Sequence, residues 1–431
     1  MTIPATNGTP GQGRFDRFDA AYDVLEPTPR RVHRILGTLP LPVLDADITA
    51  AACALPWAEA DWFCQVLEEE QLIQRSGYFG SDEDRSPLYR VGVAAQEHAA
   101  TLSHGEEVAA LDRLAAWFLV CARSVQRRLA PHQHQPPLPS PGPQLEGPGL
   151  DLPFDPFHEP AMLEWLEHQS ANLPPLLGAM EERGRPDLIW RTVDAFWPLF
   201  QQRRPYPLWA DAHRAGLAAA RSDGDRAGER RMLLSGALGL LSSGRHGEAA
   251  DWNTAARDAA RAGKDGRDEG QALYQLALLR LAERRVEDAT ALVAQALTRW
   301  ESEGYRRGEA LAQIVLAQCV TPDKPRRAVD LLSCARKTLR TEPGSDHHRI
   351  RARALRGHAR LQLGDPAGAV TDLETALTEY PEDDTSPWPA RTRDWLARAR
   401  TTLSANEPPP AAGSAPDAPA APGGLTERSG R

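Results

Sequence analysis

Lysine is nearly absent from this chain, which carries it only at Lys264, Lys324 and Lys337, whereas arginine is abundant. The net charge of the 431 residues is −9, so no overall positive field would attract the chain to nucleic acid. No apolar run reaches the ~18 residues that a membrane-spanning helix needs. Residues 1–13 lack the basic and apolar regions of a signal peptide. We therefore expect a cytoplasmic protein that binds neither nucleic acid nor a membrane.

Cysteines are few, odd in number and scattered along the chain, at Cys53, Cys64, Cys121, Cys319 and Cys334. None forms a C-x-x-C pair, so their spacing indicates neither a disulfide framework nor a structural zinc site. We expect them to act as small buried hydrophobic residues within helices.

Motifs that carry catalysis are also missing, because the chain has no Gly-x-Ser-x-Gly, His-Glu-x-x-His or Gly-x-Gly-x-x-Gly. Its close histidine pairs, His132 with His134 and His347 with His348, lack a third ligand at a useful spacing. Acidic runs such as 68–70 are interpreted as solvated faces. The sequence thus predicts a protein that is not an enzyme and that holds no metal and no cofactor.

The composition changes along the chain and suggests five segments. Residues 1–20 and 405–431 are expected to be disordered, because they have too few large apolar residues to offset the entropy of ordering. Residues 21–130 mix helical patterns with one hairpin-like stretch. Residues 131–153 are rich in proline and glycine and are interpreted as a linker. Residues 154–404 are dense in Ala, Leu, Arg and Glu with helical periodicity.

The long helical segment carries an internal repeat of small residues. Alanines recur at steps of 40, 39 and 41 residues, a second alanine follows each by seven, and a small residue precedes three of them by twelve. In chain order these positions are Ala237, Ala249, Ala256, Ala277, Ala289, Ala296, Ala328, Ala335, Gly357, Ala369 and Ala376. Small residues allow two antiparallel helices to cross closely, and helix pairs that each bury one face must stack to complete a core.

The repeat predicts about five helix pairs and a closing helix near 387–403. The pairs are 185–202 with 206–221, 227–243 with 246–262, 267–283 with 286–303, 306–319 with 325–340, and 346–363 with 366–380. The small-residue spacing resembles the tetratricopeptide repeat, whose usual period is 34 residues. The longer period here implies longer helices, and Leu316 at a small-residue position implies an irregular fourth pair. The fold class is therefore expected to be mainly α, with a right-handed superhelical solenoid.

Such a solenoid is expected to bind a protein or peptide on its concave face, which the first helix of each pair lines. Helical phase selects the exposed candidates for these contacts, which are Tyr274, Gln275, Arg280, Gln313, Gln318, Arg353 and Arg360. Trp190 and Trp197 lie seven residues apart and share a helix face. We favour an aromatic core at the start of the repeats, and the alternative is an aromatic groove that receives a peptide.

Residues 21–130 predict a separate N-terminal module. Helices are expected at about 21–40, 45–53, 57–70, 93–103 and 106–129, and strands at Leu72–Arg75 and Ser86–Val91 around a Gly-rich turn. Three helices, a hairpin and a helix form the winged-helix pattern, and a helical bundle with a long surface loop is the alternative. The segment 57–70 would be the recognition helix, but it is acidic and has no Lys or Arg, so we expect it not to bind DNA.

The residue order over 22–40 (YDVLEPTPRRVHRILGTLP) and at the end of the hairpin over 88–91 (LYRV) supports a closer resemblance. It is similar to the winged-helix segment of actinobacterial STAND-type NTPase regulators. In that family an NB-ARC nucleotide domain precedes the winged helix and tetratricopeptide repeats follow it. Residues 159–177 and 184–203 look like the family's junction between these parts, so the resemblance covers about 21–400.

Two departures limit what this resemblance implies. No phosphate-binding Gly-x-x-x-x-Gly-Lys-Ser/Thr loop occurs in the chain. The family's hydrophobic-His-Asp motif, whose histidine senses the nucleotide diphosphate, is replaced by Val91, Gly92 and Val93. We therefore expect no nucleotide to bind, unless a separate chain supplies the switch.

The leading prediction is a non-catalytic adaptor or regulator that binds a protein partner. Transcriptional or secondary-metabolism control is implied by the family resemblance alone. One alternative is a DNA-binding regulator that acts through the winged helix. The other is a fragment of a nucleotide switch that a separate NTPase chain completes.

Overall fold

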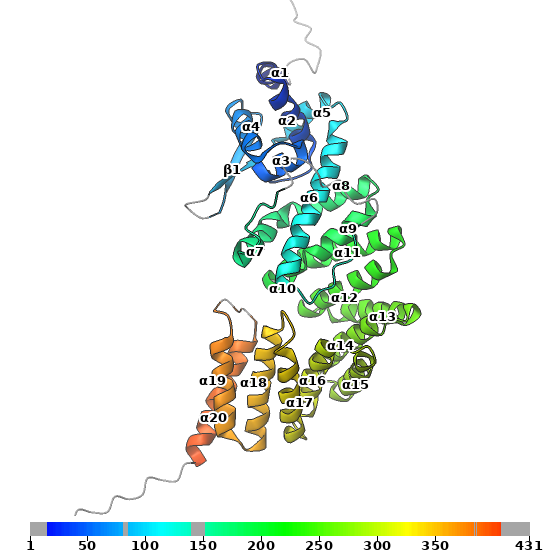
Figure 1. Ribbon diagram of the computed structural model, residues 1–431, viewed down its shortest axis with the longest axis vertical. Coiled ribbons are helices and arrows are strands. Elements are labelled where there is room, and N and C mark those ends of the chain that lie inside the picture. The colour runs from blue at the N-terminus through cyan, green and yellow to red at the C-terminus, as the bar shows by residue number, and fades with distance from the viewer. Residues whose placement is uncertain (1–14, 81–84, 139–150, 383, 385, 407–431) are drawn as a thin grey trace, which may run out of the picture.

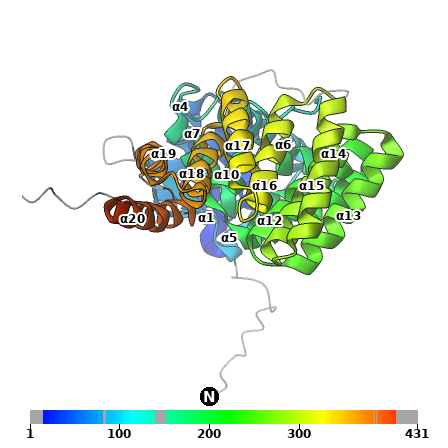
Figure 2. The same cartoon turned by 90° about the horizontal axis from the view of Figure 1, so that it is seen from below.

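The computed structural model describes residues 15–80, 85–138, 151–382, 384 and 386–406, and most of them lie in helices. The N-terminal module sits at one end of an elongated molecule, and the helix pairs follow it in a curved array (Figure 1). Seen from below, the pairs from α13 to α20 form an arc (Figure 2). The expectation of a mainly α protein built from stacked helix pairs is confirmed.

The N-terminal module contains helices and one antiparallel hairpin. Its elements are α1 (Asp16–Asp23), α2 (Pro27–Thr38), α3 (Ala46–Cys53), α4 (Trp57–Glu69), β1 (Gln74–Phe79), β2 (Ser86–Arg90), α5 (Val93–Thr101) and α6 (Glu106–Leu129). Between α2 and α3, Leu44 exchanges two backbone hydrogen bonds of 2.8 Å with Tyr89 of β2. The helices and the hairpin follow one another in the predicted order, and the winged-helix assignment of this module stays a prediction.

Helix α1 corrects the expectation of disorder through residue 20, because it begins at Asp16. Its aromatic side chains pack against His98 of α5, with Phe18 stacked at 5.7 Å between ring centroids. His98 Nε2 also lies 3.1 Å from the Asp19 carboxylate, and His98 Nδ1 lies 3.1 Å from Nε2 of buried His33. These contacts order the helix although its sequence is polar. Residues 1–14 lie outside the described residues.

The segment interpreted as a linker packs where it is described. Arg191 Nε donates to the Pro137 carbonyl at 3.0 Å, and an Nη of Arg231 donates to Gln133 Oε1 at 3.0 Å. Within α6, Gln126 Nε2 donates to the Asp194 carbonyl at 2.9 Å, so the N-terminal module and the first repeat share one hydrophobic core. Residues 139–150 lie outside the described residues.

The remaining helices follow the predicted pairs closely. They are α7 (Glu159–His168), the short 3₁₀ turn η1 (Gln169–Ala171), α8 (Leu173–Glu182), α9 (Pro186–Ala195), α10 (Trp197–Arg203), α11 (Tyr206–Asp223), α12 (Arg226–Ser242), α13 (His246–Gly263), α14 (Gly266–Ala282), α15 (Val286–Ser302), α16 (Arg306–Val320), α17 (Pro325–Leu339), α18 (Asp346–Leu363), α19 (Pro366–Glu379) and α20 (Trp388–Asn406). The predicted helix 185–202 is two helices, because Pro198 has no N–H to continue the first one.

The small residues of the repeat lie where helices cross. Ala249, Ala289, Ala328 and Ala369 have no exposed surface. At Gly357, an added Cβ would meet Leu373 Cγ at 2.6 Å, so the crossing of α18 and α19 requires glycine. In the fourth pair, α16 and α17 have 15 residues each, against 17 each in α14 and α15, and Leu316 is 8% exposed.

Tryptophans fill the core at the start of the repeats, which is the reading favoured from the sequence. Trp190 and Trp209 are 1% and 2% exposed. Trp197 packs edge-on against Trp209 with ring centroids 5.8 Å apart.

Of the cysteines, Cys334 is exposed and does not fit the expectation of burial, whereas the other four are buried. Among the described residues, no helix is long and apolar enough to cross a membrane.

Candidate binding surface

Two of the seven predicted contact residues are buried in the solenoid, so their selection as exposed residues is wrong. Tyr274 is 7% exposed and packs against Trp300 with ring centroids 5.6 Å apart. Gln275 is 2% exposed, and its Nε2 donates to the Leu234 carbonyl at 3.1 Å, which ties α14 to α12. Helix α14 contacts α12, α13, α15 and α16, and leaves few positions open to a partner.

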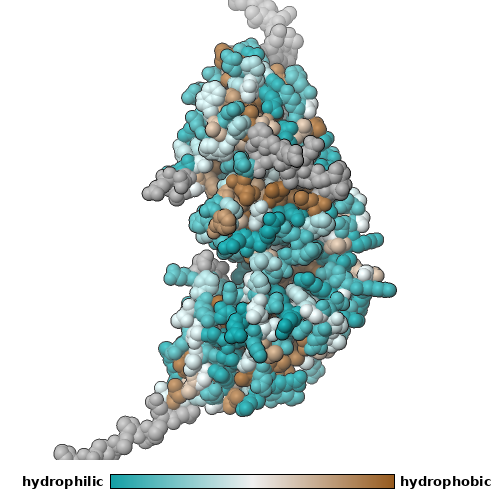
Figure 3. Space-filling view, viewed as in Figure 1, coloured by the Kyte–Doolittle hydropathy of each residue, from teal (hydrophilic) through white to brown (hydrophobic). Residues whose placement is uncertain are grey.

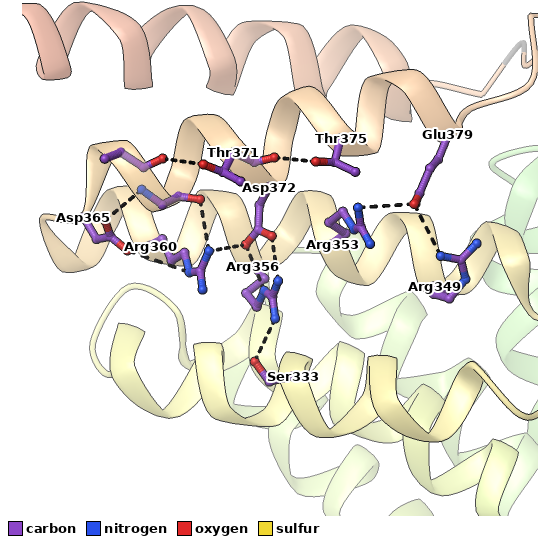
Figure 4. Close-up of polar contacts among 12 residues, drawn as sticks. Ser333, Arg349, Arg353, Arg356, Arg360, Asp365, Thr371, Asp372, Thr375 and Glu379 are labelled. Atoms are coloured by element: carbon purple, nitrogen blue, oxygen red, sulfur yellow. Dashed lines mark hydrogen bonds and ion pairs between the residues drawn. The ribbon is translucent and has the colours of Figure 1, made fainter.

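Arg353 and Arg360 form ion pairs with the next helix, and they stay predicted partner contacts. Figure 4 shows the arginines of one face of α18 reaching toward α19. Arg353 pairs with Glu379 at 3.2 Å, and Arg360 pairs with Asp372 at 3.0 Å. Arg356 also contacts Asp372, with nitrogen–oxygen distances of 2.6 and 2.8 Å. This ladder of ion pairs attaches α18 to α19.

The other three candidates keep some exposed surface. Arg280 pairs with Glu283 within its own helical turn at 2.7 Å. Gln318 Nε2 donates to the Ile314 carbonyl at 3.3 Å. Gln313 is partly buried, and its Oε1 has no hydrogen-bond partner among the described residues. They remain predicted partner contacts.

A second set of basic residues follows the repeat period but was not selected from the sequence. Arg267, Arg307 and His347 are spaced by 40 residues and stand second in α14, α16 and α18. Arg307 acts electrostatically on His347, and the charge of Arg204, next to α10, acts on His347 too. The start of α18 therefore lies within electrostatic reach of both the start of α16 and Arg204. The 40-residue spacing of these basic residues is present in the sequence, but the repeat was predicted from its small residues alone.

The segment after α6 lies against the turn between α17 and α18. A Cβ at Gly344, in the turn between α17 and α18, would lie 2.9 Å from His132 Nδ1 and 3.5 Å from Pro131 Cδ. The Gly344 backbone has a φ of +63°, which favours glycine. The turn is fixed from within by Arg307, whose guanidinium donates to the Pro343 and Gly344 carbonyls at 3.3 Å and to the Ser345 hydroxyl.

The histidines of this region are kept neutral by their surroundings. Burial lowers the pKa of His132 to about 3, with further lowering by Arg307 and His347. The protein around His347 lowers the pKa of its imidazole to about 4, although part of that ring is exposed. In Figure 3 the outline is notched where the N-terminal half meets the last repeats.

One histidine from each of the two sequence pairs, His132 and His347, belongs to the same region of the fold. His132 and His347 influence each other electrostatically, and His347 and His348 have ring centroids 3.7 Å apart. No group of three or more His, Cys, Asp or Glu side chains among the described residues could hold a metal ion.

A shallow hollow of about 410 Å³ lies between α13, α14 and α15, and Arg261, Glu269, Thr298 and Arg299 contribute to its lining. Arg261 and Arg299 pair with the Glu269 carboxylate at 2.6 and 3.0 Å. These charges satisfy one another, so the hollow offers little to a charged ligand.

The outer face of α4 combines exposed aromatic and acidic side chains. Trp57 is 47% and Trp62 58% exposed, and Glu59, Asp61 and Glu69 lie on the same helix. Carboxylates there would repel DNA phosphates, which agrees with the expectation from the sequence.

The sequence of this chain is similar to those of two curated regulatory proteins. No protein-family model matches the chain. It is 29% identical over 304 residues to "Regulatory protein AfsR" of Streptomyces griseus, and 26% identical over 308 residues to that of Streptomyces coelicolor. Each alignment covers 68% of this chain and 29% of the relative, so the chain spans less than a third of the length of these relatives.

Solved structures with similar helix arrangements include BtubC from P. vanneervenii, at 15% identity and a TM-score of 0.42, covering 59% of this chain and 99% of that one. Another is the STAND protein with a tetratricopeptide repeat sensor from Pyrococcus horikoshii, at 12% identity and a TM-score of 0.38, covering 90% and 62%. The helix pairs of this chain are of the tetratricopeptide type.

Proposed function

We propose that this chain is a non-catalytic regulator that binds a protein partner through the interior of its solenoid. The observation that supports this proposal is the curved array of helix pairs. The small residues of the repeat lie buried where the helices cross, and the stacked pairs present an extended curved surface. The similarity to curated regulatory proteins supports a role in regulation. Transcriptional control, which the resemblance in the sequence implied, and a cytoplasmic location are part of this proposal.

The test is affinity capture from a nuclease-treated native lysate, with captured proteins quantified by mass spectrometry. Wild-type chain is compared with a variant that carries Arg280→Ala and Gln313→Ala, two candidates that keep accessible surface. Arg285→Ala is the matched control, because Arg285 lies in the turn before α15 and pairs with Asp288. A protein lost from the double variant and retained by the control would support the proposal.

Enrichment that appears only when nuclease is omitted would instead favour DNA binding through the winged helix. That outcome should then show affinity that falls steeply with salt concentration, as phosphate contacts require. A captured NTPase chain would favour the nucleotide-switch alternative.

A further inference from the structure

The interior of the curve carries a cluster of basic side chains that we name the basic cluster. Its members are His132, Arg267, Arg307, His347, His348 and Arg351. They come from the segment after α6, from the first turns of α14 and α16, and from the first two turns of α18. Arg307 donates to the Gly344 carbonyl and to the Ser345 hydroxyl, two residues before His347, and a Cβ at Gly344 would lie 2.9 Å from His132 Nδ1, so these members lie close together. Arg307 also contributes to lowering the pKa of all three histidines.

The arginines of the basic cluster lack acidic partners. Among the described residues, no carboxylate lies within 4.0 Å of the guanidinium of Arg267, Arg307 or Arg351, although most other interior arginines are paired. The contrast is sharpest on α18, where Arg349 pairs with Asp346 at 3.1 Å and Arg351 pairs with no acid. Glu342 and Asp384 act only at longer range, on Arg307 and His347.

These arginines are also held in place without an anion. The Arg351 guanidinium stacks over Trp388 at 4.3 Å, and that of Arg267 stacks over Tyr305 at 4.1 Å. Arg307 is 4% exposed and is fixed by the carbonyls of the turn between α17 and α18. Side chains that are already ordered lose little entropy when a ligand arrives, which is how binding sites are pre-organised.

Two polar atoms of the basic cluster have no partner. His132 Nδ1 and Arg351 Nε are both buried and make no hydrogen bond with the described residues. A buried polar atom without a partner costs free energy unless a ligand or water satisfies it. The cluster thus has unused hydrogen-bonding capacity as well as unbalanced charge.

We propose that the basic cluster binds a phosphoryl group, carried either by a small phosphate compound or by a phosphorylated side chain of a partner. A phosphoryl group has close to two negative charges and three acceptor oxygens at neutral pH. A single carboxylate would balance only one of the three arginines. Guanidinium groups match phosphate geometry well, and neutral imidazoles supply further N–H donors. The phosphorylated-partner form of this inference rests on the proposed function, whereas the small-molecule form does not.

Isothermal titration calorimetry and thermal unfolding of the full chain test this proposal. The probes are inorganic phosphate, pyrophosphate, ADP, and a phosphoserine peptide beside its unphosphorylated form, all at equal ionic strength. At least one phosphoryl probe should bind saturably at one site and raise the Tm. Binding of the small probes alone would identify a small ligand. Preference for the phosphopeptide over its unphosphorylated form would identify a modified partner.

The decisive variant is Arg267→Gln with Arg351→Gln, and the matched control is Arg349→Gln on the same helix. The double variant should weaken binding at least about tenfold, which corresponds to 1.4 kcal/mol, and the control should leave it within about twofold. If the double variant melts early, Arg267→Gln alone replaces it, because this exposed side chain contributes little to the core.

Two results would overturn the proposal: no saturable binding of any phosphoryl probe to the wild-type chain, or equal weakening by the control. The proposed function fails separately. A chain that captures a protein partner but binds no phosphoryl probe would keep the regulator function and lose this site.

Discussion

Several histidines of this protein occupy positions where a positive charge would be costly. His213 is 1% exposed, its Nδ1–H donates to the Trp209 carbonyl at 2.9 Å, and its Nε2 lies 2.8 Å from the Ser235 hydroxyl. Burial lowers the pKa of His213 to about 4. His33 in the N-terminal module has its pKa lowered to a similar value by burial and by His98. Both side chains must gain a proton when the chain unfolds in mild acid.

We expect His213 to make stability depend on pH. Unfolded histidine titrates near 6.5, so between pH 6.5 and 4 the unfolded chain binds a proton that the folded chain does not. The stabilisation is present above pH 6.5 and is lost as the pH falls, by about 2 kcal/mol at pH 5. Urea unfolding at pH 7 and pH 5 should show a smaller difference for His213→Gln than for wild type. His246→Gln, at a half-buried ring, is the control, and an unchanged pH difference in His213→Gln would contradict the prediction.

The helix crossings should tolerate added volume very unevenly. Gly357→Ala places a Cβ 2.6 Å from Leu373 Cγ, so we expect a loss of about 1–3 kcal/mol from overpacking. Gly247→Ala, in α13, meets nothing within 4 Å and should be neutral or stabilise slightly through helix propensity. Denaturant midpoints of the two variants measure the difference. Equal midpoints would show that α18 can shift away from α19 at little cost.

Residue roles were only partly predictable. The alanines could be assigned because a crossing point admits one kind of residue, and the sequence repeats it. The contacts for a partner could not, because helical phase distinguishes faces without saying which face a neighbouring helix covers. Tyr274 and Gln275 were placed on the open face, yet α12, α15 and α16 enclose that part of α14. The basic cluster could not be predicted as a whole, because His132 is distant in sequence from the other members and no sequence spacing indicates that it lies beside Gly344.

At the scale of elements, the ion-pair ladder between α18 and α19 replaces part of an apolar interface. Asp372 is 5% exposed and accepts from both Arg356 and Arg360. Removing one member of a buried charge network leaves the others uncompensated, which costs more than the network contributes over an apolar alternative. Within this ladder, Asp372 is the carboxylate that balances two arginines in the least exposed position.

Asp372→Asn should destabilise the protein by about 2–4 kcal/mol, because two guanidinium groups lose their counter-charge in a partly buried site. The control is Glu374→Gln, whose pair with Arg400 at 2.7 Å is about half exposed and should be worth less than about 1 kcal/mol. Thermal unfolding followed by circular dichroism compares the two. A loss no larger than that of the control would mean that water reaches the ladder.

Helix limits were predicted well where capping and period agree. Asp225, Asp265 and Asp365 each accept from a backbone N–H three residues on, and α12, α14 and α19 begin within one residue of the predicted starts. Helix α1 was missed because its stability comes from aromatic contacts with α5, far along the chain. The break between α9 and α10 was missed although Pro198 signalled it, because the hydrophobic pattern continues through it.

At the scale of the whole molecule, the core is unevenly distributed. One large hydrophobic cluster joins the N-terminal module to the first repeats, and the clusters become small toward α20. In a repeat protein, stability is close to a sum of units and of their interfaces. The two ends of this chain should therefore open independently.

Hydrogen exchange followed by mass spectrometry should rank the helices accordingly. We expect α6, α9 and α11 to exchange slowest and α19 and α20 fastest, with intermediate protection between them. Truncation before α20 would expose Leu396 and Ala399, now 7% and 0% exposed, and should speed exchange in α19 before any other element. Uniform exchange along the repeats would show that the solenoid opens as one cooperative unit.

The contact of Gly344 with Pro131 and His132 has a further consequence. In an open stack, a strain can travel only from one helix pair to the next. Here the turn between α17 and α18 lies directly against the segment after α6, so these two parts of the chain are connected both through the stacked pairs and through this contact. Displacement of that turn should therefore also disturb the segment after α6, whereas α19 and α20, which follow the turn in the chain, can still open on their own.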